Sequence, residues 1–238
     1  MNDLSTLPWL TTSQMVEVDR LMIEDWHINL IQMMENAGRN LAEMVKCYVG
    51  GSISGKHIVV LSGTGNNGGG GMVAARHLHN WGAAVGLTVV GSKPHTKDVP
   101  AHQLAIIQKM GLITSNPLLD MADVIVDAMI GYGLTGDPRK PVADWIELAN
   151  ASQTPIIALD TPSGLDSTTG IPSKICIRAD VTLTLALPKV GLKTPEAQPF
   201  VGDLYLADIS VPPELYASPS LGLGIISPFS TEPIIKLL

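Results

Sequence analysis

Short runs of apolar residues recur along the chain and alternate with amphipathic stretches. The run at 58–61 is apolar at every position, which is typical of a strand buried on both faces of a parallel sheet. Similar runs follow at 85–90, 124–128, 156–159 and 181–185, and a further strand candidate spans 202–207. Helical spacing occurs between them at 72–81, 101–110 and 142–149. Strands that alternate with helices predict a doubly wound, mostly parallel sheet with helices on both faces.

Two helices are predicted before the first strand. Thr11 and Gln14 have capping-box spacing, and Met15 and Val18 begin an apolar stripe at helical intervals. A second helix is predicted from about 30 to 48, with its apolar residues on one face, and two glycines end it. No repeat or linker interrupts the chain, so we interpret residues 1–238 as a single domain.

The composition narrows the class of protein. The 238 residues carry a net charge of −7, only 16% are charged, and the mean hydropathy is +0.26, which together exclude a disordered chain. With 4% aromatic residues and no basic block, binding to nucleic acid is disfavoured. No signal-peptide or membrane-span pattern is found, so we expect a cytoplasmic protein in which Cys47 and Cys176 are buried, reduced thiols.

Glycine is concentrated in one place, with six of the chain's 23 glycines between 63 and 71. Gly63, Gly65 and Gly68 fit G-x-G-x-x-G between a predicted strand and the predicted helix at 72–81, a context whose free N–H groups favour a phosphate or another anion. The alternative is a tight turn without a ligand. An NAD-dependent dehydrogenase would add an acidic residue at the end of the second strand. That strand ends in Val-Gly-Ser-Lys, where Lys93 is either a contact for a 2′-phosphate or a solvated loop residue.

Two aspartates follow strands whose carboxyl ends are expected to meet the glycine-rich loop. In an open parallel sheet these ends form the ligand crevice, which places Asp127 and Asp160 near the loop. An aspartate after a buried run is costly unless it is paired or binds a cation. We interpret the two as a cation ligand and a proton-transfer group, or alternatively as cap or turn residues. Lys189 is a candidate to contact a ligand phosphate, and Glu35 and Asn36 are either structural or part of the crevice rim.

Five motifs, taken in order, resemble those of one family. They read MENAGRNLAE, GNNGG followed by MVAARHL, VDAMIGYGLTG, ALDTPSGLDSTTG and LALPKVGL, and the resemblance covers about 10–216. The chain is similar to the YjeF N-terminal domain, the NAD(P)H-hydrate epimerase family. The resemblance implies a three-layer α/β/α Rossmann-like fold and a homodimer. It also implies an isomerase that interconverts the R and S forms of hydrated NADH and NADPH (NADHX and NADPHX) in nicotinamide nucleotide repair, with a potassium ion in its site.

The resemblance also assigns roles to single residues. Potassium would be held by Asn67, Asp127 and Ser163, whose amide, carboxylate and hydroxyl oxygens suit a hard cation. Asp160 matches the substrate-contacting acid, and we expect it to act as the general acid–base that exchanges the hydroxyl group of the hydrated ring. The other substrate-binding positions implied are Asn66, Asn67, Gly68, Gly69, Gly70, Gly131, Tyr132, Gly133, Leu134, Thr135, Gly136 and Asp137.

The chain departs from the family pattern in two ways. The family loop reads GNNGGDG, whereas this chain has Gly70 in place of the aspartate. Loss of that carboxylate favours an alternative function, a non-catalytic module on the same fold that binds a nucleotide or a protein. Many bacterial members also continue into an ADP- or ATP-dependent dehydratase domain that is absent from this sequence. We therefore expect either an epimerase that acts with a separate dehydratase or a piece of a longer protein.

Overall fold

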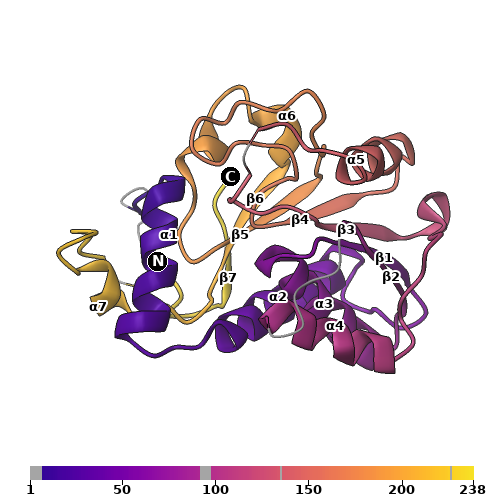
Figure 1. The fold of residues 1–238 in the computed structure, drawn as a ribbon, viewed down its shortest axis with the longest axis horizontal. Coiled ribbons are helices and arrows are strands. Elements are labelled where there is room, and N and C mark those ends of the chain that lie inside the picture. Colours follow the sequence, from indigo (N-terminus) through magenta and orange to yellow (C-terminus); the bar gives the residue numbers. More distant parts are fainter. Residues whose placement is uncertain (1–6, 92–97, 135, 226) are drawn as a thin grey trace.

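The structure, a computed structural model, describes residues 7–91, 98–134, 136–225 and 227–238 (Figure 1). A seven-stranded sheet runs through its centre in the order β2-β1-β3-β4-β5-β6-β7. Neighbouring strands from β2 to β6 pair in parallel, and β7 pairs antiparallel with β6. The predicted mostly parallel sheet is therefore confirmed, although the sequence pattern does not predict β7. The strands are β1 (His57–Ser62), β2 (Ala84–Val89), β3 (Val124–Ala128), β4 (Ile156–Leu159), β5 (Val181–Leu185), β6 (Asp203–Ala207) and β7 (Ile234–Lys236).

Helices cover both faces of this sheet. They are α1 (Thr12–Arg20), α2 (Leu30–Tyr48), α3 (Asn66–Asn80), α4 (Val99–Lys109), α5 (Val142–Ala151), α6 (Gln198–Val201) and α7 (Pro213–Tyr216). Helices α2, α3 and α4 lie on one face, and α5 lies on the other (Figure 1). The side chains of β1 alternate accordingly, because Ile58 and Val60 pack with the first group and Val59 and Leu61 pack with α5. Within the described ranges, no helix is long and apolar enough to cross a membrane.

Helix α1 is fixed beside the carboxyl end of β5. Its capping box forms as predicted: the Thr11 hydroxyl accepts the N–H of Gln14 at 3.3 Å, and the Gln14 side chain accepts the N–H of Thr11 at 2.9 Å. Leu10, just before the cap, donates its N–H to the carbonyl of Pro188 and accepts the N–H of Val190. These backbone bonds tie α1 to the segment that follows β5. An N-terminal helix is thereby brought to the end of the sheet where ligands are expected.

The glycine-rich segment forms a helix earlier than its sequence predicts. Helix α3 begins at Asn66, so Gly68 and Gly71 lie within it rather than in a loop. A Cβ atom on Gly68 would lie 2.0 Å from the carbonyl oxygen of Gly63, and one on Gly71 would lie 2.5 Å from the Cβ of Ala128. The glycines therefore let the first turns of α3 approach the ends of β1 and β3 more closely than any side chain would allow.

The two cysteines differ in exposure. Cys176 is buried, as predicted, and burial raises the pKa of its thiol to about 12. Cys47 is exposed on the last turn of α2, so the prediction of two buried thiols is wrong for this residue. The side chain of the next residue, Tyr48, is exposed as well, which shows that this turn of the helix faces solvent.

Candidate active site

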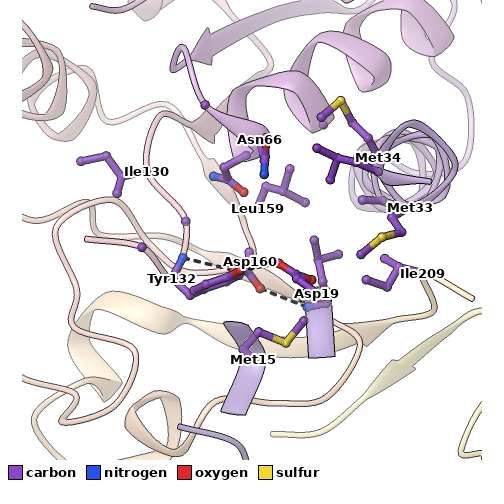
Figure 2. Close-up of a pocket in the computed structure, with 18 of the residues that line it drawn as sticks. Met15, Asp19, Met33, Met34, Asn66, Ile130, Tyr132, Leu159, Asp160 and Ile209 are labelled. Atoms are coloured by element: carbon purple, nitrogen blue, oxygen red, sulfur yellow. Dashed lines mark hydrogen bonds between the residues drawn. The ribbon is translucent and has the colours of Figure 1, made fainter. Parts of the chain in front are cut away.

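A cavity of about 340 Å³ lies where the strand order reverses. Because β1 lies between β2 and β3, the chain after β1 leads to β2 on one side and the chain after β3 leads to β4 on the other, so a crevice opens at the carboxyl ends of β1 and β3. The segments after β1, β3, β4 and β5 reach the cavity, and side chains of α1 and α2 complete its wall (Figure 2). Its lining residues, most of them apolar, are Met15, Asp19, Leu30, Met33, Met34, Ala37, Gly65, Asn66, Asn67, Gly70, Met129, Ile130, Gly131, Tyr132, Gly133, Leu159, Asp160, Leu185, Lys189 and Ile209.

Asp160 directly follows β4 and is buried in the wall of the cavity. Its φ of +68° lies in the left-handed region, which is uncommon for a residue other than glycine and is found preferentially at functional sites. Lys189 Nζ at 2.5 Å and the N–H of Leu185 at 3.3 Å donate to Oδ1, and the N–H of Tyr132 at 3.3 Å donates to Oδ2. The hydroxyl of Thr184 donates to Oδ1 at 3.4 Å. Donors on both oxygens stabilise a carboxylate.

Lys189 is the partner of Asp160 rather than a free surface cation. Its side chain is fully buried, and its ammonium group also donates to the carbonyl of Leu185 at 2.8 Å and the hydroxyl of Thr184 at 3.2 Å. With three acceptors for its three N–H bonds, the ammonium group is already satisfied. The structure thus gives Lys189 a different partner from the ligand phosphate considered from the sequence.

A second carboxyl group, that of Asp19 from α1, lies beside Asp160 (Figure 2). The hydroxyl of Tyr132 donates a short hydrogen bond to Oδ2 of Asp19, while the N–H of Tyr132 donates to Asp160. Burial raises the pKa of Asp19, although the bond from Tyr132 and the charge of Lys189 act in the opposite direction. Sequence reasoning missed this residue. The spacing along α1 could have indicated it, because Asp19 follows the buried Met15 by one helical turn and therefore lies on the inner face of the helix.

The side chain of Asp127, in β3, is fully buried. Ser163 donates to it twice, from Oγ to Oδ1 at 2.6 Å and from its N–H to Oδ2 at 2.8 Å, and the N–H of Met129 donates to Oδ1 at 3.2 Å. Complete burial raises the pKa of Asp127 to about 6 even though these hydrogen bonds lower it. Among the described residues, Asp127 has no ion-pair partner.

Asn67 lies at the start of α3, close to the loop that follows β3. A Cβ atom on Gly131 would lie 3.2 Å from Oδ1 of Asn67, so the amide is packed against that glycine. Its Nδ2 atom is buried without a hydrogen-bond partner in the part of the chain that the structure describes. Asn67, Asp127 and Ser163 supply only oxygen donors, which suit a hard cation. The described residues contain no group of three His, Cys, Asp or Glu side chains that could hold a metal ion.

The sequence-predicted substrate residues divide into two groups. Asn66, Asn67, Gly70 and 131–133 line the cavity together with Asp160. Gly68 and Gly69 instead face Gly63 and Met34. Leu134, Gly136 and Asp137 also lie outside the lining, and Asp137 is 3.8 Å from the ammonium group of Lys174. Thr135 and Lys93 fall outside the described residues. The role of the second group in binding stays a prediction.

Two residues left open by the sequence have structural contacts. Glu35 accepts a short hydrogen bond from Arg76 and pairs with His77 at 3.0 Å, which joins α2 to α3. Asn36 donates to the carbonyl of Ile209 at 3.5 Å. Neither side chain lines the cavity, so the structural interpretation fits both.

Comparison with known proteins identifies the family. A family model described as "YjeF-related protein N-terminus" matches residues 30–191, about two thirds of the chain. The chain belongs to this family. The matched range includes α2, α3 and the carboxyl ends of β1, β3, β4 and β5, so it contains most of the cavity wall.

Relatives in this family match most of the chain. An "NAD(P)H-hydrate epimerase" of Dehalogenimonas lykanthroporepellens is 40% identical over 231 residues, covering 96% of this chain and 92% of the relative. A "Bifunctional NAD(P)H-hydrate repair enzyme Nnr" of Salinibacter ruber is 35% identical, covering 87% of this chain and 41% of the relative, so the chain spans about two fifths of that protein. The crystal structure of yeast ynu0 superposes with a TM-score of 0.81 at 25% identity, covering 97% of this chain and 100% of the yeast chain.

Proposed function

We propose that this protein is an NAD(P)H-hydrate epimerase, which interconverts the R and S forms of NADHX and NADPHX. Relatives with that name are 40% and 35% identical to it over 96% and 90% of this chain. The observation that carries the proposal is Asp160, a carboxylate held by Lys189 in a mostly apolar cavity beside the amino end of α3. Such a cavity suits an apolar ring that is linked to phosphate groups.

The reaction requires proton transfer at one oxygen atom. The hydroxylated ring carbon is bonded to the ring nitrogen, so loss of the hydroxyl group as water leaves an iminium-like ion. Addition of water to the other face then inverts the centre. Asp160 reaches the cavity and is the proton-transfer group that the resemblance assigns. General acid–base catalysis of this kind contributes about 10²–10⁴-fold.

The amino end of α3 is the proposed binding site for the pyrophosphate of the substrate. The first turn of an α-helix has N–H groups without acceptors in the helix, and its dipole favours a negative charge. Helix α3 starts at Asn66 in the cavity wall and has no acidic residue in its first turn, so no carboxylate opposes an anion there. We expect the unpartnered amide nitrogen of Asn67 to donate to the substrate as well.

Potassium is the cation we propose for Asn67, Asp127 and Ser163. The fit rests on the buried carboxylate of Asp127, which lacks a cationic partner among the described residues, and on the hydroxyl of Ser163 that contacts it. When bound, the ion would balance the charge of Asp127 and hold the loops after β1, β3 and β4 in one arrangement. Replacing potassium with choline in the assay buffer should lower the epimerisation rate, and an equal rate in both salts would contradict this assignment.

Gly70 is the observation that favours the second candidate, a non-catalytic binding module. It lines the cavity at the position where the family pattern has aspartate, and a Cβ atom there would lie 2.8 Å from Cδ2 of Leu159. The cavity therefore lacks one carboxylate that the family pattern supplies. Asp160 and Lys189 are nevertheless both present and paired, which supports catalysis over simple binding.

The deciding experiment is chromatographic. Purified protein is mixed with enriched R-NADHX in potassium buffer, and formation of the S epimer is followed against the spontaneous reaction. We expect acceleration that Asp160→Asn lowers by about 10²–10⁴-fold. Nucleotide binding without any acceleration would establish the binding module instead.

Assembly and partners follow from the family alone. We propose that the protein is a cytoplasmic homodimer and acts with an ADP- or ATP-dependent NAD(P)HX dehydratase that consumes the S epimer. The bifunctional relatives support a link between the epimerase and a second activity in one chain. Sedimentation analysis of the purified protein tests the dimer, and a coupled assay with an added dehydratase tests the partnership.

A further inference from the structure

The cavity contains two carboxyl groups in contrasting surroundings. Asp160 forms an ion pair with Lys189 and receives further hydrogen bonds from backbone and hydroxyl donors. Asp19 has no ion-pair partner among the described residues and receives one hydrogen bond, from Tyr132. Burial raises the pKa of Asp19, so its proton is retained more readily than that of an ordinary aspartic acid. Two carboxyl groups with such different surroundings in one site are typical of an acid and a base.

The geometry leaves one oxygen of Asp19 available to a ligand. The hydroxyl of Tyr132 binds Oδ2, whereas Oδ1 has no partner in the part of the chain that the structure describes, although Asp19 lines the cavity. Tyr132 also donates its N–H to Asp160, so one residue positions both carboxyl groups (Figure 2). A proton donor needs such an oxygen within hydrogen-bond reach of the reacting group.

We propose that Asp19 is a second catalytic residue, the acid that protonates the departing hydroxyl group, while Asp160 is the base for the incoming water. This inference rests on the proposed epimerase function. In the first step the proton of Asp19 passes to the hydroxyl oxygen, the C–O bond breaks with its electron pair on that oxygen, and the nitrogen lone pair forms the C=N bond. In the second step water adds to the other face and its proton passes to Asp160. Exchange with solvent returns the enzyme to its starting state after the product leaves.

The groups that face Asp19 determine the direction in which its pKa is shifted, and therefore how the rate depends on pH. They are Tyr132 after β3, Asp160 after β4, Lys189 after β5 and Tyr216 of α7. Burial is the largest effect and raises the pKa of Asp19, as the charge of Asp160 also does, while Tyr132 and Lys189 lower it. Because the protonated form is the active one, the rate should fall as the pH rises through this raised pKa.

Asp19→Asn tests the proposal with little change in shape. The amide oxygen can still accept the hydrogen bond from Tyr132, but the side chain has no acidic proton to give. We expect kcat to fall about 10²–10⁴-fold with a nearly unchanged KM, and the decline of kcat/KM with rising pH to disappear. The matched control is Glu24→Gln, an exposed carboxyl group that pairs with Arg20 outside the cavity, and its profile should equal that of the unaltered protein.

Tyr132→Phe provides a second test, because a purely structural role of Asp19 would leave the pH profile of the rate unchanged. It keeps the ring but removes the hydrogen bond that lowers the pKa of Asp19, so the decline of kcat/KM with rising pH should move to higher pH. If the unaltered protein is active and Asp19→Asn keeps both its rate and this decline, the role of Asp19 is wrong and the proposed function stands. If the unaltered protein does not exceed the spontaneous rate, both are overturned.

Discussion

Lys189→Met would leave the carboxylate of Asp160 buried without its cation. At the 2.5 Å between Nζ and Oδ1, the attraction is about 7 kcal/mol for an effective dielectric constant near 20. Methionine avoids the cost of burying an ammonium group, and the N–H donors of Leu185 and Tyr132 remain, so much of that attraction is offset. Breaking one side of a buried pair typically costs about 3–5 kcal/mol, and we expect a loss near the lower end, about 3 kcal/mol.

Urea unfolding measures this loss. The double variant with Asp160→Asn should be about 2 kcal/mol more stable than the sum of the two single losses predicts. Lys236→Met, which breaks an exposed pair with Asp203, is the control and should cost less than about 1 kcal/mol. A loss at Lys189 as small as the control's would refute the reasoning.

Three further predictions test other parts of the structure. Gly68→Ala should lower the free energy of unfolding by about 3 kcal/mol, because the added Cβ would meet the backbone of Gly63. In Gly70→Ala the added Cβ meets only the end of the Leu159 side chain, so stability should change by less than about 1 kcal/mol. Urea unfolding of both variants distinguishes the two positions. Ser163→Ala removes a hydroxyl donor to a buried carboxylate and should cost about 2 kcal/mol in the same assay, with equal stability contradicting the bond. A thiol reagent at about pH 8 should modify Cys47 in the folded protein and Cys176 only after unfolding. Rapid modification of both cysteines in the folded protein would contradict the burial and the raised pKa of Cys176.

The sheet could be predicted because its signal is local. Continuous apolar runs such as those of β1 and β4 are typical of strands covered on both faces, and the alternation of strands with helices predicts the winding. Asp127 and Asp160 could be placed at the crevice for the same reason, since the carboxyl ends of neighbouring parallel strands share one edge. Their positions alone do not say which aspartate binds a cation and which contacts the substrate, and the family resemblance assigns these roles.

The remaining features depend on contacts between distant segments. Asp19 reaches the cavity only because α1 is tied to the segment after β5, and nothing in the spacing of α1 indicates that connection. Lys189 was considered for phosphate, but it turns inward to Asp160 because a buried carboxylate needs a cation. The start of α3 was predicted too late, since helix propensity disfavours glycine and only close packing against Gly63 and Ala128 compensates.

The glycines of α3 also have a consequence for how the protein is made. Each of the four glycines at 68–71 is about 1 kcal/mol less favourable in a helix than alanine, so the first two turns of α3 cannot persist on their own. One of their packing partners, Ala128 at the end of β3, follows them in the sequence and leaves the ribosome later. The amino end of α3 should therefore stay unfolded on the nascent chain until β3 has joined β1. This part of the proposed substrate site then forms later than its own position in the sequence allows, and pulse-labelling hydrogen exchange on ribosome-bound chains of increasing length would detect the delay.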